Sequence, residues 1–255
     1  MIYKYIKNDL FFYLLLFLII FFFLFFRIYI NKISNLGLHF DEAQYWSWSR
    51  EFNWGYFSKP PLISWLISLS TSFCGIEEYC IRLFSPLLHS FTALTLGLSA
   101  RILIKNNYFV LFTVILYLLM PGVVFSSFFI TTDVPLLFFS SLITFCLVYL
   151  FSKKNSNLLI WLLLSISIGL GFLSKYALIY YIVGIIVALV LLPDLRNVII
   201  NKRFFFLIII SLLIFSPNII WNLQNGLVTF NHTADNGNFN NINLSITRTL
   251  KYLIE

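Results

Sequence analysis

The sequence predicts an all-α integral membrane protein with about seven transmembrane spans, formed by residues 1–255 as a single transmembrane domain. Hydrophobic residues make up 60% of the chain and charged residues only 11%, whereas soluble domains carry roughly 25% charged residues. Apolar runs recur along the chain, several close to the roughly 20 residues that a helix needs to cross a bilayer. These two observations exclude an ordinary soluble domain.

The first predicted span covers residues 10–26 and continues past Arg27 to Ile30. Its apolar region is longer than the roughly 7 to 15 residues of a signal peptide, and no small-x-small cleavage site follows, so a retained span is predicted. Residues 245–255 read as the start of another element. Six further spans are predicted at about Ile81–Leu103, Tyr108–Phe125, Val134–Phe151, Leu158–Leu173, Tyr176–Leu192 and Phe204–Trp221.

The distribution of basic residues predicts the orientation of these spans. Nine of the seventeen Lys and Arg residues fall in the N-terminus and three alternate turns, at positions 4, 7, 101, 105, 153, 154, 196, 202 and 203. By the positive-inside rule these segments are cytoplasmic, the N-terminus included. The net charge of +7 is scattered between apolar runs, which favours contact with anionic membrane lipids and excludes nucleic acid as the expected partner.

The opposite, extracytoplasmic side then receives a long first loop, at about residues 31–79. Within it, "PLISWLISLSTSF" is too short to span a bilayer and is expected to lie as a helix in the membrane interface. Cys74 and Cys80 also fall in this loop, where both a disulfide and a pair of free thiols are consistent with the sequence.

Two adjacent carboxylates, Asp41 and Glu42, stand in this loop beside a run of Trp, Tyr and Phe. One interpretation is a helix start, with Asp41 as N-cap and Gln44 three residues later forming a capping box. The other is functional, because Lys59 follows and is presented rigidly before Pro60 and Pro61. A carboxylate that removes a proton and a cation that holds a phosphate are two parts of a transfer reaction on a phosphorylated lipid.

The motifs "FDEAQYW", "YFSKPPLISWL", "TTDVPLLFF", "GLGFLSKYALIYY" and "PNIIWNLQNGLVTFNH", in this order over about residues 36–233, resemble the dolichyl-phosphate-mannose protein mannosyltransferase superfamily. The resemblance is to the bacterial branch that includes the aminoarabinose lipid A transferase. It implies a GT-C-type helix bundle in the bacterial inner membrane, with an active site at the outer face. It also implies an inverting glycosyltransferase with a polyprenyl-phosphate sugar donor and a hydroxyl acceptor on lipid A, a glycan or a protein.

The resemblance assigns roles to the residues of the first loop. Asp41 matches the acidic residue that acts as, or assists, the catalytic base. Glu42 is its acidic neighbour, expected to orient or cap. Lys59 matches the lysine of the "KPP" motif and is expected to bind the donor phosphate.

Three further charged residues are expected to support the site. Asp133 matches a second acidic position of the family, although an Asp two residues before Pro135 is also a good helix N-cap. Lys175 is expected to bind the donor phosphate, with snorkelling to the interface as the alternative. Arg82 is a further candidate cation for the same phosphate.

A metal site is not predicted, and no cofactor is predicted firmly. His232 matches a histidine implicated in metal binding in some relatives, but a polar loop contact is the favoured interpretation. Several relatives carry Glu immediately before the "KPP" lysine, whereas this chain has Ser58. The loss of that carboxylate removes a hard ligand for a divalent ion.

Two other interpretations stay open. A small lipid or solute transporter would also present carboxylates and a lysine, although transporters concentrate ionisable residues near the bilayer midplane and show internal repeats. The second is an inactive or partial relative, because family members generally continue for several more spans. Cooperation with a separately encoded C-terminal half is one hypothesis for such a chain.

Overall fold

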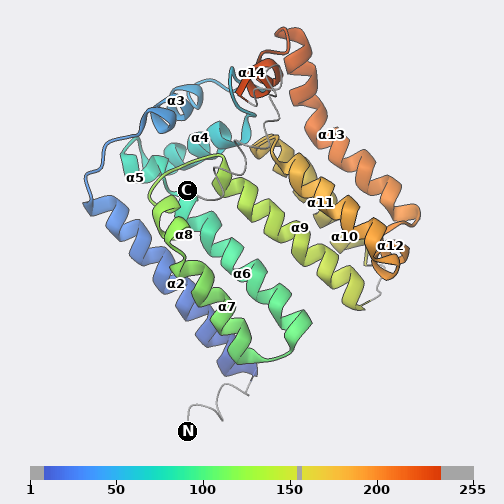
Figure 1. The fold of residues 1–255 in the computed structure, drawn as a ribbon. Coiled ribbons are helices and arrows are strands. Elements are labelled where there is room, and N and C mark those ends of the chain that lie inside the picture. The colour runs from blue at the N-terminus through green and yellow to red at the C-terminus, as the bar shows by residue number, and fades with distance from the viewer. Residues whose placement is uncertain (1–8, 154–156, 237–255) are drawn as a thin grey trace, which may run out of the picture.

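The computed structural model describes residues 9–153 and 157–236, and all regular elements within these ranges are helices (Figure 1). The prediction of an all-α fold is confirmed. Predictions that rest on Lys4, Lys7, Lys154 and residues 245–255 lie outside the described residues. The helices are α2 (Asp9–Ile33), α3 (Phe40–Trp48), α4 (Leu62–Cys74), α5 (Glu78–Ile81), α6 (Phe84–Ile104), α7 (Asn107–Leu119), α8 (Pro121–Ser126), α9 (Asp133–Lys153), α10 (Leu158–Ser174), α11 (Leu178–Leu191), α12 (Pro193–Ile199), α13 (Lys202–Gln224) and α14 (Val228–Asn236).

Four helical stretches in the described part are long and apolar enough to cross a membrane: α2, α5 with α6, α9 and α13. The bent pair α11 and α12 brings the number to five if it counts as one span. The predicted count of about seven is therefore not confirmed. Helices α7 and α10, with 13 and 17 residues, are apolar but shorter than the roughly 20 residues of a full crossing.

Proline explains why the predicted span at residues 108–125 is broken. The single helix predicted over Tyr108–Phe125 stops at Leu119, and α8 restarts at Pro121. Proline lacks the N–H that would continue the helix and disfavours helical geometry in the preceding residue. Met120 accordingly has an extended ψ of 129°. Pro193 acts in the same way between α11 and α12, which meet at an angle of 114°.

Helix α6 packs against α2, α7 and α9, and α10 packs between α9 and α13. The first group shares an apolar core that includes Phe12, Ala93 and Val114. The contact between α10 and α13 is close at Gly169, where an added Cβ would lie 2.7 Å from the Ile214 Cβ. Small residues allow membrane helices to approach in this way.

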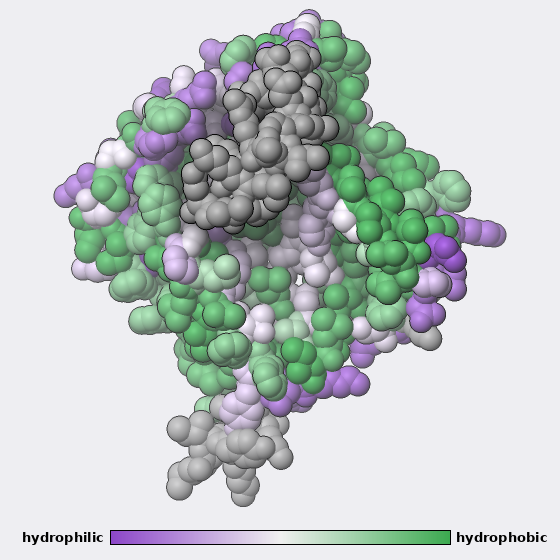
Figure 2. Space-filling view, in the orientation of Figure 1, coloured by the Kyte–Doolittle hydropathy of each residue, from purple (hydrophilic) through white to green (hydrophobic). Residues whose placement is uncertain are grey.

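Hydrophobic side chains cover much of the molecule's outer surface. Figure 2 shows them in broad green areas on both sides of a paler central strip, with the most hydrophilic side chains toward the edges. Phe22, Leu191 and Phe205 are each more than 60% exposed. A surface of this kind is stable in lipid and costly in water. The chain is a multi-pass membrane protein.

The two ends of the bundle differ in what they carry (Figure 1). Helices α3, α4, α5 and α14 gather at one end, which we call the motif end. The α6–α7 turn, with Arg101 and Lys105, and the end of α9, with Lys153, lie at the other, which we call the basic end. The predicted orientation, with the basic end in the cytoplasm, requires that the two ends differ in this way. The orientation itself stays a prediction.

Candidate active site

A buried ion pair fixes the start of α3 at the motif end. Glu42 and Arg82 are 1% and 0% exposed. Arg82 donates to both carboxylate oxygens, from Nε to Oε1 at 2.9 Å and from Nη2 to Oε2 at 2.7 Å. The carboxylate also accepts the N–H of Ile130 at 2.9 Å and that of His39 at 3.0 Å. The Glu42 side chain thereby connects α3 to Arg82, which lies just before α6, and to Ile130 in the loop before α9.

This geometry corrects two predictions. Helix α3 begins at Phe40 with His39 as N-cap, and Glu42 accepts the N–H of His39, so the predicted capping box of Asp41 and Gln44 is wrong. The phosphate-binding role predicted for Arg82 does not fit either. Its guanidinium is fully buried and also donates to the carbonyl oxygens of Leu36 and Gly37, both at 2.9 Å.

Asp41, in contrast, is half-buried and forms no hydrogen bond or ion pair of its side chain within the described part of the chain. It lies near Tyr45, which is 2% exposed on the same helix. Burial raises the pKa of Tyr45, and the negative charges of Asp41 and Asp133 raise it further. Both carboxylates therefore lie close to this phenol, which stays neutral and able to donate a hydrogen bond.

Asp133 is the first residue of α9 and forms an ion pair with Lys175, with 2.7 Å between Oδ1 and Nζ. The side chains are 56% and 32% exposed, respectively, so the pair is solvated and contributes at most about 1 kcal/mol to stability. The pair nevertheless brings together two predicted site residues that are 42 positions apart in the sequence.

Lys59 lies in a tight turn that precedes α4. The Tyr56 N–H donates to the Lys59 carbonyl oxygen at 3.2 Å, and Pro60 and Pro61 lead directly into the helix. The side chain is half-buried, and among the described residues its ammonium group forms no hydrogen bond or ion pair. The turn therefore presents an unpaired cation at the motif end.

Buried polar side chains anchor this turn to the C-terminal helices. Asn218 of α13 is 0% exposed; its amide donates to the Trp54 carbonyl oxygen at 2.6 Å and accepts the Tyr176 hydroxyl at 2.7 Å. Thr229 of α14 donates to the Tyr56 carbonyl oxygen at 2.6 Å. Because Tyr176 follows Lys175, this network ties the turn that carries Lys59 to the segment that carries Lys175.

The sequence reading did not identify Tyr176, Asn218, Asn222 and Thr229 as functional positions. A usable signal was present in the spacing of the two asparagines. Asn218 and Asn222 are four residues apart within apolar α13, and both are 0% exposed. Burying an amide side chain in an apolar environment costs free energy unless it has a hydrogen-bond partner. Two amides on one face of such a helix therefore indicate a polar contact with a neighbouring segment.

Gly55 permits the close contact between this turn and α13. A Cβ at position 55 would lie 2.3 Å from Cε3 of Trp221 and 2.9 Å from the Asn218 amide nitrogen. We expect Gly55→Ala to lower the free energy of unfolding by about 1–3 kcal/mol through overpacking. Unfolding in mixed micelles measures this, with Gly122→Ala as the control, because a Cβ there meets nothing within 4 Å. Equal stability of the two variants would contradict the expected contact.

His232 lies on α14, half-buried, with its ring 5.1 Å from that of Phe57. Ser58, immediately before Lys59, is 8% exposed. Within the described residues no three His, Cys, Asp or Glu side chains are grouped as metal ligands. His232 is thus placed as a contact of the turn that presents Lys59.

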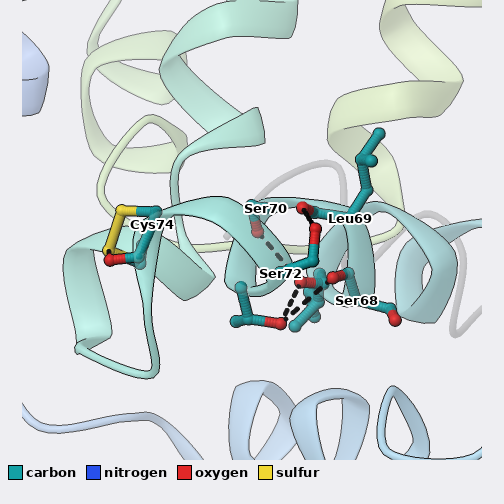
Figure 3. The surroundings of a disulfide bond; sticks show 8 residues. Ser68, Leu69, Ser70, Ser72 and Cys74 are labelled. Carbon is teal, nitrogen blue, oxygen red and sulfur yellow. Dashed lines mark hydrogen bonds between the residues drawn. A yellow bond between two sulfur atoms is a disulfide. The ribbon is translucent and has the colours of Figure 1, made fainter.

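Cys74 and Cys80 form a disulfide, the first of the two arrangements open from the sequence (Figure 3). It joins the end of α4 to α5, with Ser68, Ser70 and Ser72 along the same helix. Gly75 ends α4 with a φ of +102°, a conformation that glycine adopts without steric cost. The disulfide holds Cys80 of α5, which lies two residues before Arg82 in the sequence. It therefore supports the buried ion pair of Arg82 with Glu42.

The loops at the motif end thus hold two carboxylates near one buried phenol, together with two cations. Within the described residues neither side chain has a partner, so Asp41 can accept a proton and Lys59 can bind an anion. The ion pair of Glu42 and Arg82 stabilises the start of α3. The fold defines a multi-pass membrane protein, and the site gathers carboxylates and cations at one end of it.

The chain matches the family model of the dolichyl-phosphate-mannose-protein mannosyltransferases over residues 58–221. It belongs to this family, which contains GT-C membrane glycosyltransferases. The match begins at Ser58, next to Lys59, and ends at Trp221, so it includes Asp133, Lys175 and Asn218.

Three curated relatives are similar to the chain. A lipid A galacturonosyltransferase of Rhizobium johnstonii is 34% identical over 213 residues, which is 83% of this chain and 44% of that protein. A lipopolysaccharide core galacturonosyltransferase of the same organism is 27% identical over 74% of this chain and 38% of its own length. An undecaprenyl phosphate-alpha-4-amino-4-deoxy-L-arabinose arabinosyl transferase of Wigglesworthia glossinidia brevipalpis is 30% identical to the chain. The match covers 53% of this chain and 26% of that protein. The chain spans less than half the length of these relatives, and no solved structure matches it.

Proposed function

We propose that this protein transfers a sugar from a polyprenyl-phosphate donor to a hydroxyl group at the outer face of the bacterial inner membrane, with inversion at the anomeric carbon. Asp41 is the catalytic base, and Lys59 holds the donor phosphate. The observation that carries the proposal is the difference between the neighbouring acids. Glu42 is buried and paired with Arg82, whereas Asp41 is half-buried and has no partner among residues 9–153 and 157–236.

The reaction follows as a single displacement. The acceptor hydroxyl gives its proton to the Asp41 carboxylate as its oxygen forms a bond to the anomeric carbon. The bond from that carbon to the phosphate oxygen breaks, and polyprenyl phosphate leaves with the bonding electrons. A phosphate needs little acid assistance as a leaving group, so a base and cationic stabilisation suffice.

Asp133 and Lys175 have a supporting role. Asp133 partly neutralises Lys175 through their ion pair, which leaves Lys59 as the stronger candidate for the phosphate. The pair is partly exposed, so an arriving phosphate can draw Lys175 away from Asp133 at little cost. Lys175 is in this way a second cation that the donor recruits.

An apolar cavity of about 380 Å³ suits the lipid tail of the donor. It lies between α9, α10, α11, α12 and α13 and reaches Phe172, three residues before Lys175. Apart from Ser211, the residues that line it are apolar. A polyprenyl chain placed there is removed from polar surroundings while its phosphate lies at the motif end.

The names of the relatives favour lipid A or the lipopolysaccharide core as acceptor. Two act on these molecules by name, and the name of the third specifies an undecaprenyl-phosphate sugar donor. Reconstitution in liposomes tests the proposal with an undecaprenyl-phosphate sugar and lipid A as probes. We expect covalently modified lipid A and free undecaprenyl phosphate in equal amounts. Movement of the donor across the bilayer without a new glycosidic bond would favour a transporter instead.

Lys59→Met is expected to lower kcat/KM for the donor by about 10²-fold, because the developing charge on the phosphate loses its main partner. Titration of the donor at saturating acceptor measures the effect. Arg50→Met is the matched control, since Arg50 is an exposed cation of the same loop that stacks on Trp46. A similar loss in both variants would remove Lys59 from this role.

A further inference from the structure

The basic end of the bundle contains a cavity of about 660 Å³ that the proposed reaction does not use. It opens between the ends of α2, α6 and α9, which all belong to candidate membrane spans. Three cations, two tyrosines, one serine and four apolar side chains line it, among them Arg101, Lys105, Lys153, Tyr149, Phe145 and Leu98.

Among the residues that the structure describes, the positive charges in this cavity exceed the negative charges paired with them. Asp9 is the carboxylate that pairs with Arg101. Lys105 and Lys153 are exposed, and neither forms an ion pair within residues 9–153 and 157–236. Three cations against one carboxylate leave an excess positive charge of two, which favours an anion.

Arg101 is held in place as part of the cavity wall. Its guanidinium donates to Asp9 and Asn107 and lies over the rings of Phe12 and Tyr13, 4.7 and 4.9 Å from their centroids. The position of this cation is therefore set before any ligand arrives. Preorganisation of this kind reduces the entropy that binding costs.

The polar groups and the apolar groups occupy one cavity at the end of membrane spans. Tyr149 and Phe145 lie one helical turn apart on α9, and Leu98 and Ile102 do so on α6. A free anion would use the cations and leave the apolar wall in contact with water. A phosphate on a glycerolipid would use both, because its acyl chains cover the apolar wall.

We propose that this cavity is a binding site for the phosphate headgroup of an anionic phospholipid. Lys105 and Lys153 contact the phosphodiester, Arg101 sets its position, and the acyl chains run along α6 and α9. Basic pockets between membrane helices bind anionic headgroups in this way. The site joins the ends of three helices, so an occupied site holds them together.

The test measures binding of phosphatidylglycerol and of phosphatidylcholine with the same acyl chains to the full chain in detergent. We expect phosphatidylglycerol to bind more tightly and to raise the melting temperature. Lys105→Gln with Lys153→Gln should weaken its binding by about fivefold per lysine, on the order of 25-fold together. Both side chains are exposed and unpaired in the described part, so the melting temperature in phosphatidylcholine should not change.

The matched control removes two exposed charges near the same end, with Arg196→Gln and Lys202→Gln, which do not line the cavity. Its affinity for phosphatidylglycerol should stay within about twofold of the wild type. Equal weakening in the two double variants, or equal affinity of the wild type for both lipids, would overturn the proposal. Inorganic phosphate is the third probe, and binding of phosphate as tight as that of the lipid would identify an anion site without lipid preference and overturn it as well.

Discussion

Asp41→Asn is expected to lower kcat for sugar transfer by about 10²–10⁴-fold, the usual contribution of a positioned general base. The amide keeps the shape of the side chain but cannot accept the proton of the acceptor hydroxyl at neutral pH. The Asp41 side chain forms no hydrogen bond or ion pair within the described residues. The free energy of unfolding should therefore change by less than about 0.5 kcal/mol. Initial rates of transfer and unfolding in mixed micelles measure the two effects.

Glu51→Gln is the matched control for this variant. Glu51 is an exposed carboxylate of the same loop and forms no ion pair within the described residues. Its substitution removes the same charge from the same region, so it reports the effect of the loop's overall potential on donor binding. We expect nearly wild-type kcat. Loss of kcat in both variants by the same factor would show that Asp41 acts through charge alone and is not the base.

Glu42→Gln is expected to lower the free energy of unfolding by about 3–5 kcal/mol, although Glu42 is not assigned to the chemistry. The substitution leaves the guanidinium of Arg82, which is 0% exposed, without a counter-charge. The amide also cannot accept from Arg82, Ile130 and His39 as the carboxylate does. Unfolding in mixed micelles gives the loss, and Glu77→Gln, an exposed acid before α5, is the control.

A double-mutant cycle separates the ion pair from the remaining contacts. Arg82→Met alone should also be strongly destabilising, because it leaves the buried carboxylate of Glu42 unpaired. Glu42→Gln with Arg82→Met should cost clearly less than the sum of the two, since the second change removes a charge that the first left uncompensated. Additive losses would show that the pair does not hold the motif end together.

Sequence reasoning reached the fold class because it depends on composition and run length, which need no tertiary information. The break at Pro121 was also within reach, since proline is an explicit signal against a continuous helix. The predicted count of about seven spans is not confirmed, for a related reason. Phe, Ile and Leu abound throughout this chain, so an apolar run such as residues 108–125 looks continuous even where the backbone turns.

The candidate site could also be predicted only in part. Asp41, Glu42 and Lys59 were identifiable because charged residues are rare here and stand in a recognisable order. The family resemblance already gave them different roles, but the contacts of Glu42 were not accessible, because Arg82 is 40 residues from Glu42 and Ile130 is 88 residues away. The bonds from Asn218 to Trp54 and from Thr229 to Tyr56 span 164 and 173 residues. Pairings at such distances follow from helix packing, which local patterns do not specify.

The anomeric configuration of the product tests the central claim most directly. Reconstituted protein is supplied with a polyprenyl-phosphate sugar of one known anomeric configuration, and the new glycosidic bond is assigned by nuclear magnetic resonance. A single displacement with Asp41 as base predicts inverted configuration from the wild type and product formation slower by about 10²–10⁴-fold from Asp41→Asn. A product with retained configuration, or inverted product from Asp41→Asn at the wild-type rate, would contradict it.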